Sequence, residues 1–190
     1  DEVQTGFRRL GETWFGIEQW GVEPEIMTMA KGIANGLPLG ATIAKTEVAD
    51  ALAPPKLSTF GGNPVACAAA NATIDVIEED DLRGNAAERG AELRTGLERL
   101  LSRYPGPMGD VRGRGLMQAI EFVVNEEAGD RTPDAAAANR MLEEAREAGL
   151  LIGKGGLEGN VLRIAPPLSV SADQIAEGLS LLSYLEAIKP

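Results

Sequence analysis

Residues 25–40, EIMTMAKGIANGLPLG, carry the pattern from which the fold prediction starts. The apolar run at 25–30 is typical of a short buried strand, and a second apolar run at 37–44 follows a glycine-rich turn. Lys31 lies where the first strand ends, between apolar residues and glycines. Burial disfavours the charged form of a lysine amine and lowers its pKa, and the neutral amine is the nucleophile that forms a Schiff base. The competing interpretation is a surface lysine in a loop.

Two helices are predicted after this region. Asn63 and Pro64 form a helix-start signal, with asparagine as the N-cap and proline in the first helical position, and the helix is expected to run to about Glu79. Apolar residues then recur at helical spacing as far as Arg103, namely Leu82, Ala86, Leu93, Leu97 and Leu100. The second helix is therefore expected to be long and amphipathic.

The pattern changes at the prolines and glycines of residues 105–109, where we place a boundary between a first domain, residues 1–104, and a second domain, residues 105–190. The strands expected in the second domain are residues 115–124, 150–152 and 161–164. One helix is expected from Thr132-Pro133 to near Gly149, and another after the capping box at 171–174. The glycine-rich stretches 109–115 and 153–156 lack the spacing of a phosphate-binding loop or a dinucleotide fingerprint, and they are interpreted as turns.

Composition excludes several classes of function. The chain of 190 residues has no histidine, which excludes Ser-His-Asp triads, histidine zinc sites and histidine general bases. A net charge of −11 would repel the phosphates of a nucleic acid, and the longest weakly polar stretch, residues 64–77, is too short to cross a membrane. The single cysteine, Cys67, forms no internal disulfide, and residues 1–4 show no signal peptide, so we expect a reducing, cytoplasmic compartment.

Three further segments can carry chemistry. Residues 58–64 place a hydroxyl and a glycine pair before a helix N-terminus, which favours an anion such as phosphate, although capping by Asn63 explains them equally well. In the acidic start, residues 1–7, a buried carboxylate would keep a pyridinium nitrogen protonated, whereas the alternative is plain exposure to solvent. Arg163 interrupts an apolar strand, where an arginine binds a substrate carboxylate or forms a structural ion pair.

Taken together and in this order, these segments resemble the class III aminotransferases, pyridoxal-phosphate enzymes of fold type I. The family segment Asp-Glu-x-Gln-Thr-Gly matches residues 1–6, and Lys-Gly-x-x-x-Gly-x-Pro-x-Gly matches residues 31–40. The segment Thr-[Phe/Tyr]-Gly-Gly-Asn-Pro matches residues 59–64, and Arg-x-x-Pro-Pro-Leu matches residues 163–168. Residues 149–163 look similar to alanine–glyoxylate aminotransferases of the second type and to 4-aminobutyrate aminotransferases.

The resemblance implies a role for each motif residue. Asp1 would pair with the pyridinium nitrogen, Val3 would pack on one face of the ring, and Gln4 would approach the phenolic oxygen. Lys31 would form the Schiff base with pyridoxal 5'-phosphate and then act as the acid and base that moves a proton.

Two further residues complete the site that the resemblance implies. Thr59 would bind the cofactor phosphate of the partner subunit, which implies a homodimer. Arg163 would hold the carboxylate of the amino acid or 2-oxo acid, and no metal is implied.

The resemblance also implies the architecture. The fold is expected to be α/β: the C-terminal part of a large, mostly parallel sheet domain, a connecting helix, and a small α+β domain. Family members are more than twice as long, so the chain is expected to be a part of a longer protein and a poor enzyme alone. At Arg8 many relatives have glycine, which is expected to alter the turn after the first motif.

Two other functions remain open at this stage. An aminomutase or a decarboxylase would use the same fold and cofactor for a different bond cleavage, although Gln4 and Arg163 favour transamination. A non-catalytic binding module would keep the motifs without using them.

Overall fold

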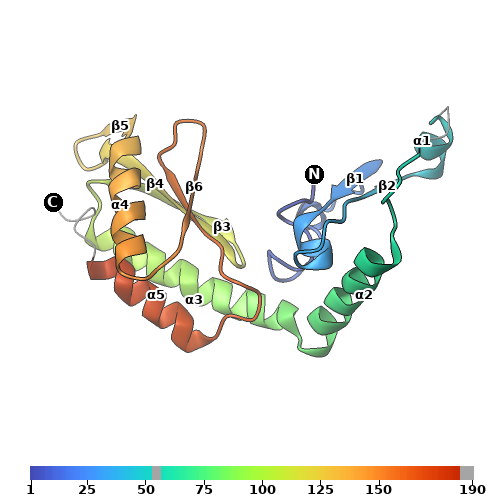
Figure 1. Ribbon diagram of the computed structural model, residues 1–190. Helices are drawn as coiled ribbons and strands as arrows, with labels where there is room; N and C mark the ends of the chain where they lie inside the picture. Colours follow the sequence, from blue (N-terminus) through green and yellow to red (C-terminus); the bar gives the residue numbers. More distant parts are fainter. Residues whose placement is uncertain (53–56, 185–190) are drawn as a thin grey trace. The chain divides into compact units, whose positions relative to one another are not determined.

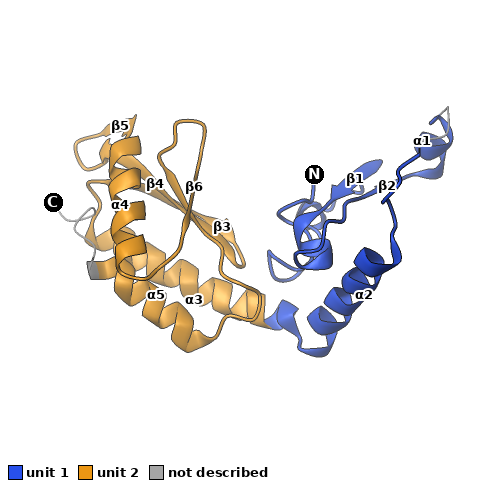
Figure 2. Ribbon diagram, in the orientation of Figure 1, with its two compact units in different colours: residues 1–84 blue, residues 85–190 orange. Residues whose placement is uncertain are grey.

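The computed structural model describes residues 1–52 and 57–184, and the chain divides into two compact units, residues 1–84 and 85–190 (Figures 1 and 2). Helix α3 (Leu82–Arg103) begins in the first unit and continues through the boundary without a break. Compact units within this chain do not decide where the domains of a longer protein meet. The predicted domain boundary after residue 104 therefore stays a prediction.

The first unit contains a small antiparallel sheet. Strands β1 (Ile26–Met29) and β2 (Ala41–Ala44) pair with each other, so the strand predicted at 25–30 is present. Its predicted burial is wrong among the described residues, because Met29 is buried but Ile26 and Thr28 are exposed. Of the second apolar run, only the last four residues form a strand. The pair is antiparallel because its connection is short. A parallel pair needs a crossover of about a dozen residues or more, whereas residues 30–40 provide only a turn and the 3-10 helix η2 (Lys31–Ala34).

Three more helices belong to the first unit: η1 (Gly16–Trp20), α1 (Thr46–Asp50) and α2 (Pro64–Glu79). Helix α2 has the predicted bounds, because Asn63 caps it: the Asn63 side-chain oxygen accepts a hydrogen bond of 2.9 Å from the Ala66 amide. Helix α2 contacts η2, and both bury small or branched apolar side chains, among them Ala66 and Ala34. Residues 31–34 are thus held between β1 and α2.

The second unit is built on a sheet with the order β3-β4-β7-β6, in which β5 also pairs with β4. The strands are β3 (Met108–Arg114), β4 (Met117–Asn125), β5 (Asp130–Pro133), β6 (Gly153–Gly155) and β7 (Val161–Ile164). Every strand pair in the described part of the chain is antiparallel. The mostly parallel sheet that we expected is therefore not part of these residues.

Two glycine-rich stretches were wrongly interpreted as turns. Most of residues 109–115 belong to β3, and residues 153–155 form β6, whereas residues 150–152 are not a strand. Glycine is depleted in strands, and here the pairing with β4 and β7 outweighs that preference. At Gly113 the backbone has φ of 138°, and an added Cβ would lie 2.1 Å from the Met117 carbonyl oxygen, so the β3–β4 hairpin requires glycine.

Helices α4 (Ala135–Glu147) and α5 (Ala172–Tyr184) follow their caps. Helix α4 begins later than predicted, because residues 130–133 pair with β4 and the side chain of Asp134 caps the helix through the Ala137 amide, at 2.8 Å. The capping box before α5 is confirmed, since Ser171 and Gln174 exchange hydrogen bonds of 3.0 and 3.2 Å.

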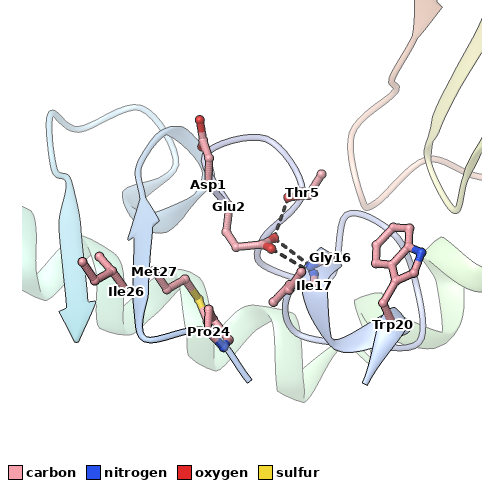
Figure 3. A pocket seen from close by; sticks show the side chains of 9 residues that line it. All are labelled: Asp1, Glu2, Thr5, Gly16, Ile17, Trp20, Pro24, Ile26 and Met27. Carbon is pink, nitrogen blue, oxygen red and sulfur yellow. Dashed lines mark hydrogen bonds between the residues drawn. The ribbon is translucent and has the colours of Figure 1, made fainter. Parts of the chain in front are cut away.

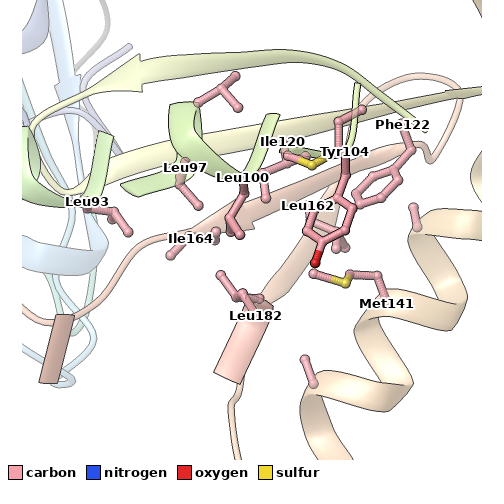
Figure 4. Packing of buried hydrophobic residues seen from close by; sticks show 14 of the residues in the cluster. Leu93, Leu97, Leu100, Tyr104, Ile120, Phe122, Met141, Leu162, Ile164 and Leu182 are labelled. Atoms are coloured by element: carbon pink, nitrogen blue, oxygen red, sulfur yellow. The ribbon is translucent and has the colours of Figure 1, made fainter. Parts of the chain in front are cut away.

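One hydrophobic core fills the second unit (Figure 4). It combines alternate residues of β4 and β7 with residues of α3, α4 and α5: Leu93, Leu97, Leu100, Ile120, Phe122, Met141, Leu162, Ile164 and Leu182. The predicted apolar residues of α3 are buried in this core, except that Leu82 is only half-buried. Gly90 lets α3 approach the loop before β4, where an added Cβ would lie 2.5 Å from the backbone of Gly115.

Candidate functional site

The first motif is tied to β1 through a main-chain hydrogen bond and is closed by a second one within the motif. The Glu2 amide donates to the carbonyl oxygen of Thr28 at 2.8 Å, and the Glu2 carbonyl accepts from the Gly6 amide at 3.0 Å. Because Thr28 is in the strand that leads to Lys31, residues 1–6 and the lysine are anchored to the same strand. The structure thus connects two segments that the sequence placed some 25 residues apart.

Glu2 is the buried carboxylate of the acidic start. Its side chain is inside the first unit, with 4% of the residue exposed. The carboxylate accepts hydrogen bonds from the Thr5 hydroxyl at 2.5 Å, from the Gly16 amide at 2.7 Å and from the Ile17 amide at 2.9 Å (Figure 3). Since Gly16 and Ile17 open η1, the carboxylate caps that helix.

Two opposing effects act on the pKa of Glu2. Burial by itself raises the pKa, but the hydrogen bonds from Thr5, Gly16 and Ile17 together lower it, and the net result lies below the ordinary value of 4.5. Glu2 is therefore ionised at neutral pH. A carboxylate fixed in this way serves as an anchor for the motif rather than as a proton donor.

The three predicted cofactor residues of the first motif lie around this anchor. Asp1 is exposed, and its Oδ1 accepts a hydrogen bond of 3.0 Å from the Val3 amide; Val3 is half-buried and Gln4 is exposed. Asp1 borders a pocket of about 280 Å³, of which Figure 3 shows the lining. The lining residues are Asp1, Glu2, Thr5, Gly16, Ile17, Trp20, Pro24, Ile26 and Met27, so Asp1 is the one predicted site residue among them.

Lys31 is exposed and is the first residue of η2. Its backbone has φ of 50°, in the left-handed region that costs a non-glycine residue about 1–2 kcal/mol. Strain of this kind persists where the surroundings hold it, and it concentrates at functional sites. The backbone of Lys31 is fixed on both sides, by strand β1 before it and by the buried residues Ile33 and Ala34 after it. The described residues leave its side chain exposed, so they do not supply the desolvation that we expected.

Thr59 is exposed ahead of α2. The Gly61 amide donates to the Ser58 hydroxyl at 3.1 Å, and the Asn63 side-chain amide donates to the Phe60 carbonyl at 3.0 Å. Together with the cap on Ala66, these contacts confirm the capping interpretation of Asn63. They leave the phosphate-binding role of Thr59 as a prediction; Thr59 precedes in sequence the positive end of the 16-residue helix α2.

Arg163 belongs to the second unit, on β7. Its neighbours along the strand, Leu162 and Ile164, are buried, whereas Arg163 is exposed on the opposite face of the sheet. Arg112, in the same row of that face, is bound by Glu121 and by Asp110, the latter at 2.9 Å. Arg112 is thus neutralised by its own carboxylates.

Arg8, where the motif departs from many relatives, adopts a left-handed backbone conformation, and the predicted effect on the turn stays a prediction. Its φ of 64° is a left-handed conformation that glycine adopts without strain. The Arg8 guanidinium donates to the Glu12 carbonyl at 3.0 Å and lies 4.3 Å from the centre of the Trp14 ring. Both contacts hold the Arg8 side chain against the turn.

Sequence reasoning missed Glu2 and Thr5. Both are in the motif, but the amides that Glu2 binds are 14 and 15 residues further along the chain. No local signal marks such a contact. In the described ranges no group of three or more histidine, cysteine or acidic residues is placed to hold a metal. None of the helices described is both long enough and apolar enough to span a membrane.

The donor set of the first unit fits pyridoxal phosphate chemically. Lys31 provides a primary amine for an aldehyde, and Asp1 provides a carboxylate for a ring nitrogen. Thr59, in the segment that leads into α2, provides a hydroxyl for the phosphate of a cofactor held by a second copy of the chain.

Comparison with known proteins gives a consistent picture. The family described as "Aminotransferase class-III" matches residues 1–185. The chain is 45% identical, over 174 residues, to the mitochondrial "Alanine--glyoxylate aminotransferase 2 homolog 2" of Arabidopsis thaliana, covering 91% of this chain and 36% of that protein. It is 42% identical, over 184 residues, to "4-aminobutyrate aminotransferase GabT" of Escherichia coli, covering 96% of this chain and 42% of that one.

A solved structure of a phospholyase from Arthrobacter in complex with phosphoethanolamine is also similar, with a TM-score of 0.92 and 37% identity. The match covers 100% of this chain and 45% of that chain. The chain therefore spans less than half the length of these relatives, between 36% and 45%.

Proposed function

Because this chain belongs to the class-III aminotransferase family, we propose that the protein containing it transfers an amino group from an amino acid to a 2-oxo acid with pyridoxal 5'-phosphate. The family is pyridoxal-phosphate-dependent, and the resemblance stated from the four motifs is confirmed. The similarity to 4-aminobutyrate and alanine–glyoxylate enzymes supports an ω-amino acid or alanine as the donor. The observation that carries the proposal is the strained backbone of Lys31, anchored with residues 1–6 to one strand.

Each residue of the first unit has a proposed role. Bound pyridoxal phosphate would supply an aldehyde that condenses with amines and a ring that accepts electrons. Lys31 would hold it covalently and carry a proton on Nζ, Asp1 would hold a proton on the ring nitrogen, and Val3 and Gln4 would fix the ring's face and its phenolic oxygen.

Thr59 would bind the cofactor phosphate of a second copy of the chain, which makes the proposed assembly a homodimer. Arg163 would bind the substrate carboxylate through a bidentate pair, a role supported by the match of residues 163–168 to the family segment Arg-x-x-Pro-Pro-Leu. No nucleic acid, membrane or metal enters the proposal.

The rest of the longer protein would complete the fold. We propose that it supplies the parallel part of the large sheet, that residues 1–104 belong to that large domain, and that residues 105–190 form the small one. The isolated chain would then be inactive. The single cysteine, Cys67, supports a cytoplasmic location.

A second candidate function is elimination of phosphate from a phosphorylated amine, supported by the similar phospholyase structure. Aminomutase, decarboxylase and non-catalytic roles are the further alternatives. A reaction panel separates them: transamination produces a new amino acid from an added 2-oxo acid, phospholyase activity releases phosphate from phosphoethanolamine, and decarboxylation releases carbon dioxide. Phosphate or carbon dioxide release without amino exchange would contradict our choice.

The cofactor site is tested by borohydride reduction of the whole protein with pyridoxal phosphate, followed by peptide mass mapping. We expect the reduced label on Lys31, and we expect Lys31→Ala to abolish both the label and amino transfer. Lys45 is the matched control, because it is the next lysine along the chain and forms ion pairs with Glu23 and Glu25. A label on Lys45, or on neither lysine, would contradict the proposed site.

A further inference from the structure

We propose that Gly153 is a positioning residue for Arg163, and that it determines how well the protein binds substrates with a carboxylate. This inference rests on the proposed function, in which Arg163 binds that carboxylate. It adds to the carboxylate site a second residue, Gly153 on a different strand, whose lack of a side chain leaves room for the Arg163 guanidinium.

The sheet register puts Arg163 between two small residues. Arg163 on β7 is paired with Ala119 on β4 and with Gly153 on β6, so the three residues form one row across the sheet. Because Leu162 and Ile164 point into the core, the row lies on the opposite face. The side chain of Arg163 therefore has a methyl group on one side and no side chain on the other.

The guanidinium lies beside the position that a side chain at residue 153 would occupy. An added Cβ at Gly153 would be 3.6 Å from Nη2 and 3.7 Å from Nε of Arg163. These distances are ordinary contacts, so a methyl group would only touch the guanidinium. A branched side chain would extend a further carbon–carbon bond, about 1.5 Å, into the space of those two nitrogens.

The other glycine on the same face of β6 does not have this relation. Gly155 is paired with Val161, and an added Cβ there would meet no atom within 4 Å. Both glycines are in the same short strand, and they face the same side of the sheet. Gly155 is thus a matched control that differs from Gly153 in its distance from Arg163.

Valine is the informative replacement, because it favours strand conformation and should not unfold β6. At residue 153 its methyl groups would push the guanidinium into another rotamer and turn its paired donors away from the carboxylate. Bidentate arginine–carboxylate binding depends on this geometry, so a displaced guanidinium would bind the carboxylate more weakly.

The test uses the whole protein with three variants: Gly153→Val, Gly155→Val and Arg163→Ala. Equilibrium dialysis of radiolabelled 4-aminobutyrate and alanine against cofactor-free protein measures carboxylate binding without turnover. Steady-state kinetics of the loaded protein with the same donors separates KM from kcat. For the donor that the unmodified protein binds better, we expect Gly153→Val to raise Kd and KM at least tenfold and to change kcat less than about threefold. Arg163→Ala should change Kd and KM in the same direction. Gly155→Val should have the same constants as the unmodified protein.

Two results would overturn the inference, and they differ. If Arg163→Ala raises Kd and KM but Gly153→Val behaves like Gly155→Val, Gly153 does not position Arg163, and the proposed function stands. If Arg163→Ala changes neither constant for either donor, the proposed role of Arg163 fails, and the inference fails with it.

Discussion

At the scale of single residues, Glu2 offers the sharpest test of the anchor. We expect Glu2→Gln to lower the free energy of unfolding by about 1.5–3 kcal/mol at pH 7, because a buried carboxylate that binds two amides and a hydroxyl becomes an amide with one accepting oxygen. Urea denaturation measures the change. Glu12→Gln is the control, since Glu12 is exposed, and an equal loss in both variants would contradict the anchoring role.

The same residue predicts a pH dependence. Because folding lowers the pKa of Glu2, its contribution to stability is fully present above the ordinary value of 4.5 and is lost as the pH falls through the lower, folded pKa. The difference in unfolding free energy between the unmodified chain and Glu2→Gln should therefore be constant near neutral pH and shrink below pH 4.5. Urea denaturation across that range checks it, and a difference that grows with acid would contradict the sign.

Arg8 tests the left-handed turn. Arg8→Ala and Arg8→Gly both remove the contact with Trp14, worth about 0.5–1 kcal/mol at an exposed site. Only glycine also relieves the left-handed backbone strain, which costs about 1–2 kcal/mol. The larger loss of backbone entropy that glycine undergoes on folding offsets about 0.5–1 kcal/mol of this gain. We expect the glycine variant to be the more stable of the two by about 0.5–1 kcal/mol in urea denaturation. An alanine variant of equal or higher stability would show that the turn is not strained.

At the scale of elements, Asn63 separates the capping of α2 from anion binding at its N-terminus. Asn63→Ala should destabilise the chain by about 1 kcal/mol. Asn63→Asp keeps the oxygen that caps Ala66 and loses only the exposed hydrogen bond to Phe60, so it should destabilise the chain less than Asn63→Ala. In the whole protein, Asn63→Asp should nevertheless weaken pyridoxal phosphate binding, because it places a negative charge where the phosphate is proposed to bind. Thermal denaturation and cofactor titration measure the two effects, and unchanged titration in Asn63→Asp would contradict the phosphate site.

At the scale of the whole molecule, the two units should differ in local stability. Strands β4 and β7 each have a neighbour on both sides and bury side chains such as Ile120 and Leu162, which are at most 1% exposed. Strands β1 and β2 form a two-stranded sheet, and such sheets are marginal alone. In native-state hydrogen exchange of this chain we expect the slowest amides in β4 and β7 and fast amides in β1 and β2. Equal protection in the two sheets would contradict this expectation.

Much of the fold could be predicted because its signals are local. The start of α2 follows from Asn63 and Pro64, and the start of α5 follows from the capping box at 171–174. Strands β3 and β6 could not be predicted, because glycine-rich segments have no strand preference of their own and become strands only through pairing. The predicted start of α4 was wrong because residues 130–133 pair with β4, which is a contact between segments distant in the chain.

For the candidate site, the motifs predicted which chemical groups are present: the amine of Lys31, the carboxylate of Asp1, the hydroxyl of Thr59 and the guanidinium of Arg163. Each group is in a motif that its neighbours in the chain define. The burial of Glu2 and the position of Gly153 beside Arg163 became known only from the folded structure. The two kinds of feature differ in how far apart along the chain the interacting atoms are. Motifs and caps depend on atoms a few residues apart, whereas a buried carboxylate and a strand neighbour depend on contacts between segments that the chain brings together only when it folds.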